Sequence, residues 1–138
     1  MTNDKSLAHT LGPILGATYI LLGIVGFFVT GFTGFTANTN ETLLGLELNV
    51  FHNIVHIGAG LFLFIMTRFT PAPAAEGAMM GVGLTLVVLF VIGVTGDGNL
   101  SILSVVGMGS AIHFFHLVTG VLVLVIGLLA SSQTQAQM

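Results

Sequence analysis

Four histidines of this chain fall into two pairs with helical spacing, His52 with His56 and His113 with His116. Residues three or four positions apart lie on one face of a helix, so each pair presents its imidazoles together. Residues 53–60 and 113–120 also share one pattern, in which a polar residue precedes a histidine by three positions and a glycine follows it by four. Ionisable groups inside membrane helices are costly and mark candidate sites.

Three kinds of chemistry remain open for these histidines. In a structural role, His56 and His116 hydrogen-bond across a helix interface, with Asn53 and His113 in the same network. In a cofactor role, the histidines hold haem iron, another tetrapyrrole or a single metal ion, mainly through His56 and His116 with His52 and His113 assisting. Glu47 and Asp97 are then candidate extra ligands or supporting residues.

Proton or ion passage is the third interpretation, because histidines titrate near neutral pH. The four paired histidines all belong to the half of the membrane that carries Glu47 and Asp97. We expect the other half of every span to lack ionisable groups, so that a relay would stop halfway.

The composition is that of a membrane protein. Of its 138 residues only 5% are charged, and the mean hydropathy is +1.07, whereas soluble domains carry about 25% charged residues. Lys5 and Arg68 are the only basic residues apart from histidine, which argues against nucleic-acid binding. The chain contains no cysteine, and no catalytic triad or phosphate-binding motif is evident, so we predict a protein that is not an enzyme.

Four segments are apolar enough to cross a bilayer, which requires about 20 residues each. The predicted fold is therefore an all-α membrane protein, a single domain with four transmembrane helices. The first three spans are predicted at Leu11–Phe32, Leu48–Thr67 and Ala78–Gly96, and the fourth lies within Leu100–Ala130 and begins near Ser110.

The connections are predicted from their composition. Residues 69–77 contain Pro71 and Pro73 and are expected to form a loop. Residues 131–138 are polar and are expected to be a disordered tail. An alternative in which the first span is a signal peptide is disfavoured by the lack of a small-residue cleavage site. Basic residues fall on one side of the membrane, which predicts that both termini are cytoplasmic.

The spans repeat as two helical hairpins, at about 11–68 and 77–130. A shift of 65 positions places Gly12 and Gly16 on Gly77 and Gly81, and a shift of 60 places His56 and Gly60 on His116 and Gly120. This predicts two pseudo-symmetric units related by an axis along the membrane normal. Glycines at one-turn spacing let helix backbones approach closely, so these six are predicted helix-packing positions (Gly12, Gly16, Gly60, Gly77, Gly81 and Gly120).

The segment Leu48-Asn49-Val50-Phe51-His52-Asn53-Ile54-Val55-His56 resembles a family of small four-span prokaryotic membrane proteins called domain of unknown function 4383. The resemblance covers about Leu11 to Ala130 and implies a four-helix protein of the prokaryotic plasma membrane. It implies no activity. The chain departs from the family pattern at His113, where an asparagine is expected.

Together these features predict a small, non-enzymatic integral membrane protein that acts as an oligomer or as an accessory subunit of a larger membrane complex. The alternative is a protein that binds haem, a tetrapyrrole or a metal ion through the paired histidines.

Overall fold

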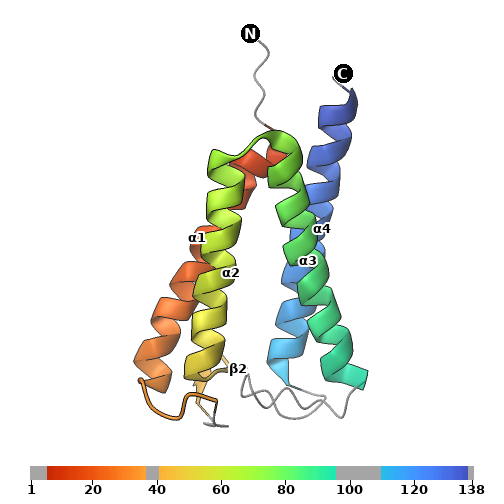
Figure 1. The fold of residues 1–138 in the computed structure, drawn as a ribbon. Coiled ribbons are helices and arrows are strands. Elements are labelled where there is room, and N and C mark those ends of the chain that lie inside the picture. The colour runs from red at the N-terminus through yellow and green to blue at the C-terminus, as the bar shows by residue number, and fades with distance from the viewer. Residues whose placement is uncertain (1–5, 37–40, 96–109, 137–138) are drawn as a thin grey trace.

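In the computed structural model, which describes residues 6–36, 41–95 and 110–136, the chain forms four long helices and one small pair of strands (Figure 1). The helices are α1 (Leu7–Thr30), α2 (Val50–Phe69), α3 (Ala72–Thr95) and α4 (Ala111–Ala136). Each is long and apolar enough to cross a membrane. The predicted all-α membrane fold is therefore confirmed, including the start of the last helix directly after Ser110.

The predicted loop at residues 69–77 is wrong, because α3 already begins at Ala72. Pro73 lies in the first turn of that helix, where a missing backbone N–H does no harm. The carbonyl of Pro71 accepts hydrogen bonds from the backbone N–H groups of Ala74 and Ala75 and so starts the helix. The turn between α2 and α3 is consequently short.

Two other predicted boundaries differ from the structure. The expected disordered tail is helical as far as Ala136, because α4 continues through the polar residues that follow Ala130. The connection between α1 and α2 contains antiparallel strands, β1 (Thr42–Leu43) and β2 (Leu46–Glu47). Their turn places Leu44 and Gly45 at positive φ, the conformation that glycine adopts most readily.

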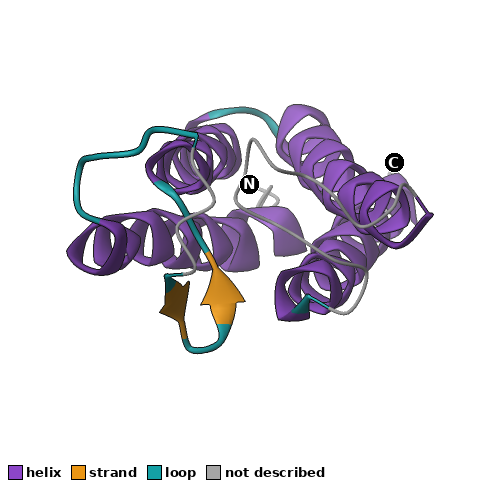
Figure 2. Ribbon diagram, turned by 90° about the horizontal axis from the view of Figure 1, so that it is seen from below, coloured by secondary structure: helices purple, strands orange, loops and turns teal. Residues whose placement is uncertain are grey.

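The helices pack as two antiparallel hairpins, α1 with α2 and α3 with α4 (Figure 1). We call the end that carries β1, β2 and the starts of α2 and α4 the β end. The opposite, terminal end carries the start of α1, the α2–α3 turn and the end of α4. In the view along the bundle, the strands lie beside the α1–α2 hairpin (Figure 2).

Close backbone contact between glycines holds each hairpin together. A Cβ added to Gly60 would lie 2.6 Å from the carbonyl oxygen of Gly16, and one added to Gly120 would lie 2.9 Å from that of Gly83. Gly12 packs against the side chain of Thr67. Four of the predicted packing positions, Gly12, Gly16, Gly60 and Gly120, thus lie where a larger side chain would overlap the neighbouring helix.

Gly77 and Gly81 do not pack against another helix within the described chain, so the contact predicted for them is not made inside the bundle. Both are exposed, and an added Cβ would meet nothing within 4 Å. Gly83, two residues further on, makes the α3–α4 contact instead. The sequence comparison shifted the first helix by 65 positions, because that shift matches glycine with glycine. The glycines that make the equivalent contacts, Gly16 and Gly83, are 67 positions apart.

The pattern of buried residues repeats between the two hairpins, with an offset of 67 positions from α1 to α3 and of 60 positions from α2 to α4. Every buried residue of α2 has a buried counterpart 60 positions later, as His56 has in His116. Five buried residues of α1 have buried counterparts 67 positions later, namely Ala8, Gly12, Gly16, Tyr19 and Gly26 with Ala75, Met79, Gly83, Leu86 and Gly93. The two hairpins thus bury equivalent faces.

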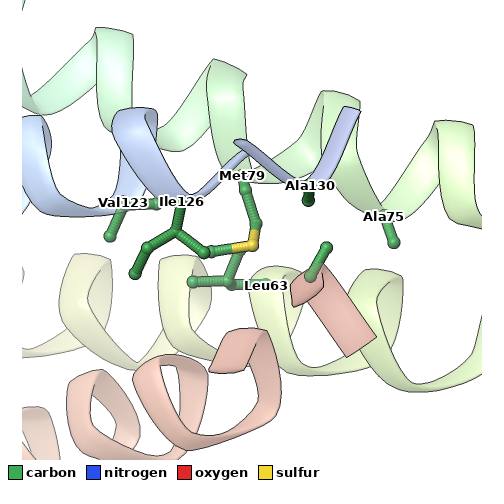
Figure 3. Packing of buried hydrophobic residues seen from close by; sticks show 7 residues of the cluster. Leu63, Ala75, Met79, Val123, Ile126 and Ala130 are labelled. Carbon is green, nitrogen blue, oxygen red and sulfur yellow. The ribbon is translucent and has the colours of Figure 1, made fainter. Parts of the chain in front are cut away.

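The apolar core lies in the terminal half of the bundle and draws on all four helices (Figure 3). Leu63, Met79 and Val123 are almost completely buried at its centre. Small residues, Ala8, Ala75 and Ala130, allow the helices to converge there. Large apolar side chains such as Ile14, Phe28 and Val118 point outward, as expected for surfaces that face lipid.

Candidate metal site

His52, His56 and His116 come together in the half of the bundle nearer the β end. Each offers a ring nitrogen, and these nitrogens all lie within 4.8 Å of one another. The ring centroids of His52 and His56 are 4.4 Å apart, and those of His52 and His116 are 5.8 Å apart. All three side chains are buried, with at most 4% of their surface exposed. We call these three residues the histidine trio.

Local structure at the start of α2 fixes two members of the trio. The side chain of Asn49 caps this helix and accepts a hydrogen bond of 2.7 Å from the backbone N–H of His52. His56 follows one turn later on the same face. Asn49 is itself fully buried, so the cap holds the first turn of α2 rigidly inside the protein.

A hydrogen bond from the strand pair links the start of α2 to the start of α4, the helix that carries His116. Glu47 of β2 accepts a hydrogen bond of 2.5 Å from the hydroxyl of Ser110, and the backbone carbonyl of Ser110 accepts from His113 in the first turn of α4. Glu47, predicted as a ligand or supporting residue, is thus bound to the start of α4 and is not a member of the trio. Asp97, predicted for the same role, lies outside the described residues.

Tyr19 forms one wall of the trio and was missed by the sequence analysis. Its ring meets that of His56 edge to face at 5.6 Å between centroids. Its hydroxyl donates a hydrogen bond of 2.8 Å to Thr119. Tyr19 is the only tyrosine of the chain and stands on α1, so only the fold reveals that it contacts a histidine of α2 and a threonine of α4.

The trio contains imidazole nitrogens without hydrogen-bond partners. Among the described residues, neither ring nitrogen of His56 has a partner, and Nδ1 of His116 has none. Buried polar atoms are almost always paired, because an unpaired one costs about 1–3 kcal/mol. A purely structural network between His56 and His116 would use these atoms, so the observed arrangement disfavours that interpretation.

Asn53 and His113 occupy matched positions but differ in their contacts. The amide of Asn53 donates a hydrogen bond of 2.8 Å to the hydroxyl of Thr30, and its side chain packs against Gly26. The ring of His113 packs against Gly93 of α3, and His113 is not a member of the trio. Within the described residues neither of its ring nitrogens has a hydrogen-bond partner.

Glu76 is a second buried residue that the sequence analysis missed. It lies near the start of α3 at the terminal end, is 3% exposed and accepts a hydrogen bond of 2.7 Å from Thr134. The expectation that this half of every span lacks ionisable groups is therefore wrong. The error follows from placing residues 69–77 in a loop. Apolar core residues, Leu63 and Val123 among them, lie between Glu76 and the trio along α2 and α4, which argues against a continuous proton path.

The apolar helices and their packing define a small, multi-pass integral membrane protein of four helices. Within that class, the family model described as domain of unknown function, DUF4383, matches residues 9–129. The chain belongs to this family, as the sequence resemblance predicted. No curated protein and no solved structure matches the chain.

Proposed function

We propose that this protein binds a single transition-metal ion in the membrane through the histidine trio. The observation that carries the proposal is the convergence of three buried imidazoles whose ligand nitrogens all lie within 4.8 Å of one another. Imidazole nitrogens bind such ions at about 2.0–2.1 Å, which places the nitrogens of one coordination sphere roughly 3.4 Å apart. To reach that spacing, the ligand nitrogens of the trio, which lie within 4.8 Å of one another, would have to approach by at most about 1.4 Å.

The unpartnered nitrogens support an ion rather than a hydrogen-bond network. A bound ion would supply the missing partner to one nitrogen of His56 and of His116, and so remove the cost of burying it unpaired. Tyr19 and the surrounding helices keep the site away from bulk solvent, which strengthens the interaction between ligand and ion.

The same spacing argues against haem, the other cofactor considered from the sequence. Two axial histidines of a haem stand on opposite faces of the macrocycle. A third imidazole nitrogen within 4.8 Å of both would lie where the macrocycle itself must be. This argument excludes a haem held by two axial histidines, and the proposal is limited to a single ion, which three converging imidazoles can bind together.

Metal analysis of protein purified in mild detergent and reconstituted in nanodiscs tests the proposal. We expect one ion per chain after loading and dialysis, no Soret band, and loss of the ion in His56→Phe and His116→Phe. His9→Gln is the matched control, because His9 lies at the terminal end and bonds the carbonyl of Thr70. A folded protein that retains none of the first-row ions tested would contradict the proposal.

We also propose, as a second role, that chains self-associate through α3. Gly77, Gly81 and Thr85 lie at one-turn spacing on an exposed face of that helix, the pattern that permits close helix approach in membranes. Photobleaching of labelled protein in native-membrane nanodiscs should show dimers or larger oligomers that Gly81→Ile dissociates. A monomer in the wild type would overturn this role and leave the metal site unaffected. An accessory role in a larger complex stays a prediction.

A further inference from the structure

We propose that a groove on the outer side of α1 and α2 binds one anionic phospholipid, whose phosphate lies at Arg68 and whose acyl chain follows α1. The groove has a volume of about 440 Å³, and its lining residues are Pro13, Ile14, Ala17, Thr18 and Leu21 of α1 and Phe64 of α2. Volumes of roughly 300–1,000 Å³ are typical of ligand sites. None of these residues belongs to the histidine trio, so the inference does not rest on the proposed metal site.

The groove suits an acyl chain in its chemistry and in its length. Its lining residues are uncharged, and Ile14 and Leu21 are 61% and 60% exposed. The hydroxyl of Thr18 already donates a hydrogen bond of 2.9 Å to the carbonyl of Ile14. From Pro13 to Leu21 the groove extends over about 12 Å of the helix axis. The hydrocarbon of one leaflet is roughly 15 Å deep, so a lipid tail aligned with α1 fills the groove along its whole length.

Arg68 lies at the end of this groove. It follows Phe64 by four positions on α2, so the two side chains lie on the same face of the helix. Its neighbour Thr67 packs against Gly12, one residue before Pro13, which places Arg68 level with the start of the groove on α1. Arg68 is also the last residue but one of α2, whose 20 residues match the length that crosses the hydrocarbon core. The guanidinium is therefore at the depth of the lipid headgroups.

The side chain of Arg68 is suited to a phosphate. It is exposed, and its guanidinium carbon lies over the ring of Phe69, 5.5 Å from the ring centre. The face of an aromatic ring attracts a cation without using its hydrogen-bond donors. A guanidinium binds a phosphate through two parallel N–H···O bonds. Because the lining residues carry no charge, the cation at the end of the groove favours a headgroup with a net negative charge over a zwitterionic one.

Native mass spectrometry of the full chain tests the inference. The protein is released from nanodiscs that contain equal amounts of phosphatidylglycerol and phosphatidylcholine, and the lipids that remain bound are identified. We expect one retained lipid per chain, with phosphatidylglycerol preferred about 5-fold, the factor that corresponds to one cation near the membrane surface. Arg68→Gln should remove this preference, and Arg68→Lys should keep most of it.

A second pair of variants tests the groove itself. Ala17→Phe places a large side chain in the groove and should lower the retention of both lipids several-fold. Gly58→Phe is the matched control, because Gly58 is exposed on α2 and a Cβ there meets nothing within 4 Å. Thermal unfolding of every variant confirms that it is folded. His56→Phe should retain the lipid, and the groove variants should retain the metal ion, so that the two proposals are tested separately.

Three outcomes would overturn the inference. Equal retention of the two lipids by the wild type would exclude a headgroup site at Arg68. A preference that survives Arg68→Gln, or retention that survives Ala17→Phe, would show that the lipid lies elsewhere. Lipid-free dimers that Ala17→Phe dissociates would show that a second copy of the chain occupies the groove.

Discussion

The two helical hairpins bury the same face but place different side chains on it. His56 and Gly60 of the first hairpin correspond to His116 and Gly120 of the second. His52, however, corresponds to Ile112, and Tyr19 corresponds to Leu86. Asn53 bonds Thr30, whereas its counterpart His113 packs against Gly93.

This difference separates what the fold requires from what the site requires. Shared positions supply the close glycine contacts and one histidine from each hairpin. The third histidine of the trio and the tyrosine beside it come from the first hairpin only. Packing alone needs neither residue, because Ile112 and Leu86 serve at the matching positions. We therefore infer that His52 and Tyr19 serve the site rather than the fold.

The largest effect is expected from a substitution that disrupts the glycine packing that both hairpins share. Gly60→Leu should lower the free energy of unfolding by about 3 kcal/mol or more, because its Cβ would meet the carbonyl of Gly16 and the backbone N of Ile20. Gly58→Leu on the same helix is the matched control, since a Cβ there meets nothing within 4 Å. Unfolding in graded denaturing detergent, followed by circular dichroism, measures both. Equal stability of the two variants would contradict the glycine contact.

The next largest effect is expected from a substitution that makes the two hairpins alike at one position of the site. His52→Ile gives the first hairpin the residue of the second, and we expect ion affinity to fall about 100-fold while the fold is kept. Chelator competition measures the affinity, and the thermal unfolding temperature checks the fold. Unchanged affinity would show that His52 is not a ligand.

The sequence predicted the helices and the paired histidines but not their partners. Long apolar segments are sufficient to place four spans, and helical spacing puts His52 and His56 on one face. The arrangement between hairpins depends on how helices cross, which apolar periodicity does not encode. His116 therefore joins the trio while His113, three residues earlier, packs against α3.

Other errors have local causes. Two prolines favoured a loop at residues 69–77, although a proline in a first turn is tolerated, and Glu76 was consequently overlooked. Gly77 and Gly81 repeat the spacing of Gly12 and Gly16 but face outward. Spacing between glycines thus predicted a close contact, but the face on which the contact lies had to come from the structure.

A smaller effect is expected from the contact between His113 and Gly93, which differs from the contact that Asn53 makes in the first hairpin. Gly93→Ala should destabilise the protein by about 2 kcal/mol, because the added Cβ overlaps the imidazole ring. In a His113→Ala background the same change should cost less than about 0.5 kcal/mol, since the ring is absent. A double-mutant cycle on unfolding free energies measures this coupling. Additive effects would contradict the contact, and ion binding should persist in every variant.

The smallest effect concerns the wall of the site. Tyr19→Phe removes the hydrogen bond to Thr119 and keeps the ring against His56. We expect a loss of about 0.6 kcal/mol in unfolding free energy, typical of hydrogen bonds in membrane proteins, with ion affinity nearly unchanged. A large fall in ion affinity would show instead that the hydroxyl takes part in binding.

X-ray absorption spectroscopy of the metal-loaded protein in nanodiscs tests the central claim most directly. We predict a first shell that contains three imidazole nitrogens at about 2.0 Å, recognised by their scattering. His52→Ile should reduce the shell to two imidazoles. A first shell with fewer than three imidazoles in the wild type, or one that His52→Ile leaves intact, would contradict the assignment of the trio as the metal site.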